Sequence, residues 1–216
     1  MTEILASWKQ LIEDRKQTHA WDMEKEVNRQ DLDDMLAELH RRVPVKQNRV
    51  HYQISVLDYS DPELRDKYYE FCVDRDNPDH RYNPQVLAPY ILVFSWRDPG
   101  AFAADFSGSP HEFQKWLSHL EIGLAANFLV HSAAARGIDT GFCKCYDTRF
   151  EHAPEIVERL GLNSVDDIYL TLGVGYGSDL QETLNPFTQK MVDAPYDEKW
   201  RVEPKPDMSE YIKFIK

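Results

Sequence analysis

Residues Ile122-Gly-Leu-Ala-Ala-Asn-Phe-Leu-Val-His-Ser-Ala-Ala-Ala135 are the most informative segment for the architecture, because they are apolar on nearly every face of a helix. It belongs to a longer predicted helix that begins at Ser109-Pro-His-Glu112, a capping box with proline at the first helical position. This helix can run to Arg136, and Gly137 follows as its stop. A helix that is apolar all round is buried on most sides, either in a core or in an interface between subunits.

Three segments on either side of this helix have the patterns of β-strands. Residues 50–56 alternate between apolar and polar side chains, as in a sheet with one face exposed to water. Residues 90–96 and 168–174 are mostly apolar, which is typical of buried strands. Helices and strands are mixed without strict alternation, so we expect an α+β domain with one central sheet and a long buried helix.

Shorter helices are predicted elsewhere in the chain. Residues 4–16 and 29–41 each place apolar side chains on one helical face, and Asn28 is the predicted N-cap of the second helix. Asp61-Pro62 begins another helix, because aspartate caps helices and proline suits the first helical position. A further helix is expected over about residues 153–160.

The composition bounds the class of protein. Hydrophobic residues make up 42% of the 216 residues and charged residues 29%, which is ordinary for a globular protein. The formal net charge of −12 argues against a nucleic-acid-binding surface. The sequence contains neither a transmembrane run nor a signal-peptide pattern. Three cysteines, an odd number, then favour reduced thiols and a cytoplasmic location.

We expect a single domain over residues 1–216, in which the proline-rich extension 195–216 docks onto the body or a partner subunit.

Two polar segments are candidate ligand sites. Arg15-Lys-Gln-Thr-His-Ala-Trp-Asp22 carries two cations, an amide, a hydroxyl and an imidazole just past a helix, and such a cluster can bind a phosphate. The alternative is a solvated helix end, where basic residues are favoured in any case. In Pro44-Val-Lys-Gln-Asn-Arg-Val-His-Tyr52, Gln47 and Asn48 precede a strand, where amides commonly bind ligands. The alternative there is an ordinary turn asparagine.

Two further segments resemble known binding motifs only superficially. Cys143 and Cys145 are one residue apart, but zinc needs about four ligands, and no second pair at a suitable spacing is present, so no metal site is expected. Their spacing is also not the Cys-x-x-Cys of redox pairs. Gly173-Val-Gly-Tyr-Gly177 is not a dinucleotide fingerprint; it predicts a strand end where other atoms pass close to the backbone. No hydrolase triad motif and no Walker loop occur.

In their order along the chain, these segments resemble the nitroreductase family of flavoproteins. Arg15–Asp22 resembles the family's phosphate motif Arg-x-Ser-x-Arg/Lys-x-Phe, and Pro44–Tyr52 resembles Pro-Ser-x-x-Asn-x-Gln-Pro-Trp. The other resembling segments are Leu87–Phe94 (an Ala-Pro pair and strand), Ala125–Gly137 (the central helix), Phe142–Asp147 (a turn ending in Phe-Asp) and Leu172–Gly177 (Leu-Gly-Tyr-Pro). The resemblance covers about residues 12–190.

The resemblance implies a nitroreductase-like fold, with a mixed or antiparallel central sheet flanked by helices, and a homodimer with two FMN molecules at the subunit interface. Arg15 and Gln17 would hold the phosphate, Asn48 would bind the pyrimidine edge of the flavin, and the turn around Lys144 would face the flavin N5. Lys190 is the nearest candidate for a late cation at the phosphate. The full set of expected cofactor-binding residues is Arg15, Lys16, Gln17, His19, Asn48, Cys143, Lys144, Cys145 and Lys190.

The function implied is an FMN-dependent oxidoreductase that transfers hydride from NADH or NADPH through the flavin to a nitroaromatic, quinone or similar acceptor in a ping-pong cycle. The cofactor carries the redox chemistry, so no catalytic side chain is named. Gln17 and His19 replace the serine and the second cation of the family motif. These departures leave open a flavin-binding sensor or interaction protein without reductase activity, or an enzyme that remodels flavin or oxidises a specialised metabolite.

Overall fold

The computed structural model describes residues 2–15, 17–19, 21–58, 60–72, 84–98, 110–144, 146–178 and 208–212. The elements, in chain order, are α1 (Thr2–Asp14), α2 (Arg29–Arg42), the 3-10 helix η1 (Lys46–Asn48), β1 (Tyr52–Leu57), α3 (Pro62–Phe71), η2 (Pro84–Leu87), β2 (Tyr90–Trp96), α4 (Pro110–Ala134), β3 (Asp139–Cys143), α5 (Ala153–Arg159), η3 (Val165–Asp167), β4 (Ile168–Gly175) and α6 (Met208–Tyr211). The expected extension 195–216 and the loop 74–85 lie mostly outside the described residues.

The described strands form one antiparallel sheet in the order β1-β2-β4-β3. Three of the four strands were predicted from the sequence, and β2 has the predicted bounds. The first strand begins at Tyr52 rather than at residue 50, because Val50 has a φ of 35°, which no extended strand adopts. The edge strand β3 was not predicted, because its sequence, Asp-Thr-Gly-Phe-Cys, is short and contains a glycine.

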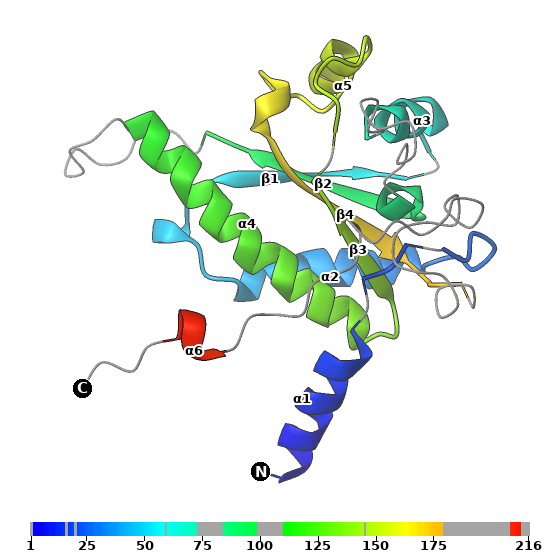
Figure 1. Ribbon diagram of the computed structural model, residues 1–216, viewed down its shortest axis with the longest axis vertical. Helices are drawn as coiled ribbons and strands as arrows, with labels where there is room; N and C mark the ends of the chain where they lie inside the picture. Colours follow the sequence, from blue (N-terminus) through cyan, green and yellow to red (C-terminus); the bar gives the residue numbers. More distant parts are fainter. Residues whose placement is uncertain are drawn as a thin grey trace.

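Helices cover both faces of the sheet (Figure 1). Successive side chains of β2 alternate between two cores, as the pleat of a strand requires. Leu92 and Phe94 pack into the core formed with α2 and α4. Ile91 and Val93 pack into the core formed with α3 and α5. The expected α+β architecture, a central sheet flanked by helices, is therefore confirmed.

The long helix α4 runs diagonally across the sheet (Figure 1). It ends at Ala134, two residues before the predicted end, and Gly137 follows with a φ of +68°, as expected for a helix stop. Its apolar side chains divide between two faces. Those facing the sheet are buried, whereas Trp116, Leu120 and Leu124 on the opposite face are 59%, 53% and 43% exposed in the single chain.

The predicted helix caps are present. Asn28 accepts a hydrogen bond from the backbone N–H of Gln30 at the start of α2, and Asp61 accepts one from Leu64 at the start of α3. The predicted helix over 153–160 is α5, which ends at Arg159. These caps depend on residues two or three positions apart, so the local sequence is enough to specify them.

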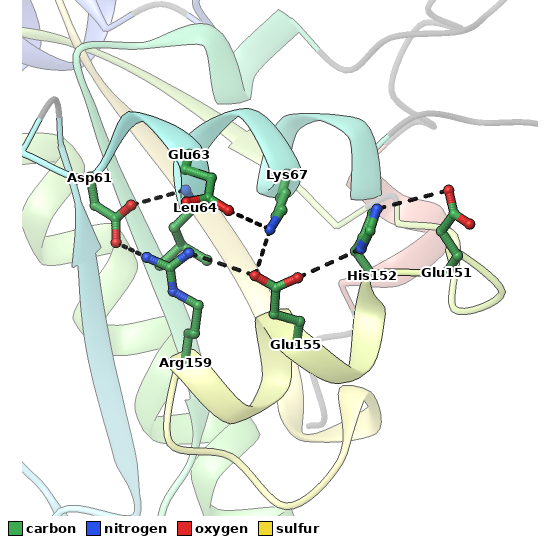
Figure 2. A network of polar contacts seen from close by, with 8 residues as sticks. All are labelled: Asp61, Glu63, Leu64, Lys67, Glu151, His152, Glu155 and Arg159. Atoms are coloured by element: carbon green, nitrogen blue, oxygen red, sulfur yellow. Dashed lines mark hydrogen bonds and ion pairs between the residues drawn. The ribbon is translucent and has the colours of Figure 1, made fainter.

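Charged side chains join α3 to α5 at the surface (Figure 2). Lys67 Nζ lies 2.6 Å from Glu155 Oε1 and 2.7 Å from Glu63 Oε1. Arg159 pairs with Asp61, the N-cap of α3. Because these groups are partly exposed to solvent, each pair stabilises the fold only slightly, but together they link the two helices.

Glycines let η2 and the segment after α1 lie directly against the sheet. A Cβ at Gly173 would stand 2.1 Å from the carbonyl oxygen of Gln85, and one at Gly141 would stand 2.4 Å from the carbonyl oxygen of Thr18. At Gly175 a Cβ would stand 2.5 Å from Pro89. The predicted close approach to the backbone at the glycine-rich strand end is thus confirmed.

Candidate functional site

The segment after α1 pairs with the free edge of β3. The backbone N–H of Thr18 donates to the carbonyl of Thr140 at 2.9 Å, and Gln17 forms a parallel bridge with the same residue. The side chain of Gln17 continues this pairing: its amide nitrogen donates to the carbonyl of Phe142 at 2.8 Å, and its oxygen accepts from the N–H of Phe142 at 3.0 Å. The side-chain amide therefore acts as an additional peptide group at the sheet edge.

Arg15 lines a cavity beside this edge. The cavity has a volume of about 280 Å³, and its other walls come from the end of α4 and the start of β3. Asp139 is one of those walls, and its Oδ2 accepts a hydrogen bond from the N–H of Gly177 at 2.7 Å. Two buried hydroxyls near this region, of Thr18 and Ser178, have no hydrogen-bond partner among the described residues. Neither hydroxyl lines the cavity, but a guanidinium group that does line it fits an anion such as a phosphate.

His19 is held in a neutral form. Its Nδ1 lies 3.0 Å from the carbonyl oxygen of Gln17, which can only accept, so Nδ1 carries the proton. Its Nε2 then accepts from the side-chain amide of Gln85 at 3.0 Å. Burial lowers the pKa of the His19 imidazole, and the hydrogen bond to Gln17 only partly opposes this. At neutral pH the ring therefore contributes no second positive charge beside Arg15.

Asn48 lies elsewhere, in η1 at the start of β1. It borders a cavity of about 550 Å³ between α2 and β1. The backbone around it is unusual, since φ is 54° at Gln47, 57° at Asn48 and 35° at Val50. Such angles cost about 1–3 kcal/mol at each residue that is not glycine, and a β-branched residue such as Val50 rarely adopts them. Strain of this kind is typical of functional loops.

The single chain brings together some of the predicted site residues and separates others. Gln17 and His19 lie beside β3, where Phe142 is followed by the buried Cys143 and then by the exposed Lys144. Asn48 lies beyond β1, the opposite edge of the sheet, and three strand spacings of about 4.8 Å give roughly 14 Å between the two edges. The predicted residues Lys16, Cys145 and Lys190 lie outside the described residues.

Sequence reasoning missed Glu121, the acid that adjoins the long apolar run of α4. Its carboxylate is 2% exposed and accepts hydrogen bonds from the backbone N–H of Lys46 at 2.8 Å, from the backbone N–H of His51 at 2.8 Å and from His51 Nδ1 at 2.9 Å. Burial, together with the Glu121 charge, raises the pKa of Tyr52 to about 12. A charged residue bordering an otherwise apolar helix was the available signal, because a buried charge needs partners.

The described residues contain neither a metal-binding cluster nor a membrane-spanning helix. No group of three or more His, Cys, Asp or Glu side chains is arranged to hold a metal ion there. No helix in the described part of the chain has the length and apolar character needed to cross a membrane.

Comparison with known proteins identifies the family of this chain. The model of the nitroreductase family matches residues 12–176, which is more than half of the chain. No curated protein sequence matches. Solved structures share the fold: Bacillus subtilis ydfN has a TM-score of 0.69 and 15% identity over 98% of this chain and 100% of its own.

Two other solved structures are similar. The FMN-dependent nitroreductase NfnB of Mycobacterium smegmatis, solved in complex with NADPH, has a TM-score of 0.63 and 14% identity over 99% of this chain and 100% of its own. The enone reductase CLA-ER of gut-bacterial fatty acid metabolism has a TM-score of 0.58 and 17% identity over 81% of this chain and 95% of its own. At such identities the structures show the fold alone, whereas the family match spans both the Arg15 segment and the Asn48 loop, and this chain belongs to the nitroreductase family.

Proposed function

We propose that this chain is an FMN-dependent oxidoreductase of the cytoplasm that works as a homodimer and passes hydride from NADH or NADPH to a nitroaromatic, a quinone or a similar acceptor. The observation that carries the proposal is Arg15, which lines the cavity at the β3 edge. Family membership supports the same assignment.

The phosphate end of the cofactor fits the Arg15 cavity. A phosphate monoester carries about −1.5 to −2 charges at neutral pH, and a hydrogen bond to a charged group contributes about 1.5–3 kcal/mol. Arg15, which lines the cavity, would supply one such bond. Asp139 opposes an anion there, although Gly177 already donates to one of its oxygens. Lys16 and Lys190 remain proposed sources of further positive charge.

The flavin ring requires a second subunit. Arg15 and Asn48 lie toward opposite edges of the sheet, so two copies of the chain are the simplest way to bring both residues to one cofactor. The exposed apolar side chains Trp116, Leu120 and Leu124 of α4 provide a surface for that association. In the proposed dimer, Asn48 of the partner subunit would bind the pyrimidine edge of the ring.

Bound FMN would supply the two-electron chemistry, since its N5 is the atom that exchanges hydride with nicotinamides and acceptors. The residues of the chain would bind and orient this cofactor. Gln17 fixes the backbone of Phe142 and therefore the start of the turn that Cys143 and Lys144 begin. No side chain in this scheme needs to act as a nucleophile or a base, which agrees with the absence of a hydrolase motif from the sequence.

The test compares FMN with riboflavin, which lacks the phosphate. We expect the purified protein to show flavin absorbance that NADH or NADPH bleaches. Arg15→Ala should weaken FMN binding about tenfold or more and leave riboflavin binding unchanged. Arg29→Ala, which removes an exposed arginine paired with Asp33 on α2, is the control and should change neither affinity. A colourless protein that binds neither flavin contradicts the proposal.

A second function is favoured by one observation. The Gln17 amide is already paired with Phe142, and His19 is neutral, so the phosphate site has fewer free donors than the family motif supplies. A flavin-binding sensor or interaction protein would tolerate such a site. Bound flavin that neither nicotinamide reduces, or reduced flavin that no nitroaromatic or quinone reoxidises, would favour this alternative.

A further inference from the structure

We propose that Glu121 is a positioning residue: its buried carboxylate holds the loop 46–51 in the conformation that presents Asn48. The inference rests on the proposed function, because it assigns Asn48 to the flavin. Glu121 itself does not border the Asn48 cavity, so its action would pass through the loop backbone.

Glu121 forms hydrogen bonds with the first and the last residue of the loop. Oε1 accepts from the backbone N–H of Lys46, which opens η1, and also from His51 Nδ1. Oε2 accepts from the backbone N–H of His51, which directly precedes β1. Glu121 is 2% exposed and His51 is fully buried, so water cannot replace these bonds without opening the core. One side chain on α4 thus fixes both ends of a six-residue loop.

The loop needs such a restraint because its backbone is strained. Gln47, Asn48 and Val50 all have positive φ, and none of them is glycine. Residues in such conformations persist only where the surrounding structure fixes them. Arg97 supports the end of the loop nearer to β1, where its guanidinium donates to the carbonyl of Val50 at 2.8 Å. Without the carboxylate, we expect the loop to relax to ordinary angles and Asn48 to lose its fixed position.

A carboxylate is required here, and an amide of the same shape is not equivalent. Three N–H donors converge on two oxygens. In Glu121→Gln one oxygen becomes an NH2 group, which cannot accept, so at least one buried donor faces another donor. The change keeps the volume of the side chain and therefore tests the hydrogen bonds rather than the packing.

The first experiment uses the flavin-free protein, so that it does not depend on the proposed function. Trypsin cleaves after Lys46 and Arg49, which both lie in the loop. We expect Glu121→Gln to speed cleavage at these two bonds about tenfold, because the loop opens locally more often. Glu38→Gln is the matched control: it weakens an ion pair between α2 and Arg136, which lies two residues past the end of α4, and should leave loop cleavage unchanged.

If Glu121→Gln does not fold, variants of His51 test whether the hydrogen bonds of Glu121 restrain the loop. The side-chain nitrogen of asparagine occupies nearly the place of imidazole Nδ1, so His51→Asn keeps the donor to Glu121, whereas His51→Leu removes it. We expect loop cleavage to rise in the leucine variant and to stay near the original rate in the asparagine variant. Equal rates in both variants, or protection of the loop in Glu121→Gln, would overturn the proposal.

A second measurement links the loop to the flavin. Glu121→Gln should weaken FMN and riboflavin binding by the same factor, about tenfold, because the ring contact is lost and the phosphate contact is kept. This pattern differs from that of Arg15→Ala, which should affect FMN alone. If the original protein binds no flavin, the proposed function fails while the trypsin result still decides whether Glu121 orders the loop. Unchanged flavin affinity with faster loop cleavage would refute the positioning role.

Discussion

The side chain of Gln17 is paired with the backbone of Phe142, 125 positions away in the sequence, through two hydrogen bonds of 2.8 Å and 3.0 Å. This pairing attaches the segment after α1 to the edge of β3 and so aligns Arg15 and His19 with the sheet. A glutamine stands where the family motif has serine, and the structure gives it a definite structural use at that position.

Replacing Gln17 by alanine should lower the free energy of unfolding by about 1–3 kcal/mol, because two net hydrogen bonds of about 0.5–1.5 kcal/mol each are lost. Urea denaturation followed by circular dichroism measures the change. Gln53→Ala is the control, since Gln53 is also half-buried and donates one side-chain hydrogen bond, to the carbonyl of Leu160 at 3.0 Å. Equal losses of unfolding free energy in the two variants would show that the two hydrogen bonds to Phe142 stabilise the protein no more than the single bond of Gln53 does.

Replacing Gly173 by alanine should destabilise the protein by about 3 kcal/mol or more, because the new Cβ would stand 2.1 Å from the carbonyl oxygen of Gln85 and force η2 off the sheet. Gly161→Ala serves for comparison. It has no atom within 4 Å of the new Cβ but a φ of +68°, so only the backbone penalty of about 1 kcal/mol applies. Thermal unfolding of both variants measures which one is less stable. A smaller loss of stability in Gly173→Ala than in Gly161→Ala would contradict the prediction.

Introducing a charge on the exposed face of α4 should separate the proposed dimer. Leu124 is 43% exposed in the single chain, and Leu124→Glu would place a carboxylate in an apolar interface. We expect the mass in solution, measured by light scattering, to fall from two chains to one, with flavin lost at the same time. Val56→Glu, at an exposed position of β1, should leave the mass unchanged. A monomeric original protein would be incompatible with the shared cofactor site.

Removing Lys67 should destabilise the protein only in a defined pH range. The hydrogen bond to Glu155 raises the pKa of Lys67, and the same bond lowers the pKa of Glu155 from 4.5 (Figure 2). The carboxylate contribution is present above that value and is lost as pH falls below it. The Lys67 contribution is present below 10.5 and is lost as pH rises beyond it.

We therefore expect Lys67→Met to lower the urea midpoint at pH 7, with the difference disappearing near pH 3 and shrinking in high salt. Urea titrations at the two pH values provide the measurement. A difference that persists at pH 3 would mean that the lysine stem, rather than its charge, stabilises the contact between α3 and α5.

His19 should make the folded state sensitive to acid. Burial lowers its pKa below the ordinary 6.5, so the unfolded chain binds a proton more readily than the folded one. Stability from this group is complete above 6.5 and falls as pH drops below it. We expect His19→Gln to flatten the pH dependence of the unfolding free energy below pH 6.5. Nuclear magnetic resonance titration of the imidazole carbons checks the pKa directly, and a value above 6.5 would refute the neutral assignment.

The elements whose stabilising contacts are local could be predicted from the amino-acid sequence. The caps at Asn28 and Asp61, the stop at Gly137 and the buried strand β2 follow from residues a few positions apart or from simple periodicity. The motif order also sufficed to indicate the family, because it reflects sequence patterns and not distances.

The hydrogen-bond partners of the candidate site residues became known from the three-dimensional arrangement of the chain. Gln17 is engaged by Phe142, 125 residues away, and the buried Glu121 reaches His51 across 70 residues. The strand order likewise placed Asn48 and Arg15 toward opposite edges of the sheet. Hydrogen bonds between such distant residues depend on how the chain folds back on itself, and no local pattern in the sequence records them.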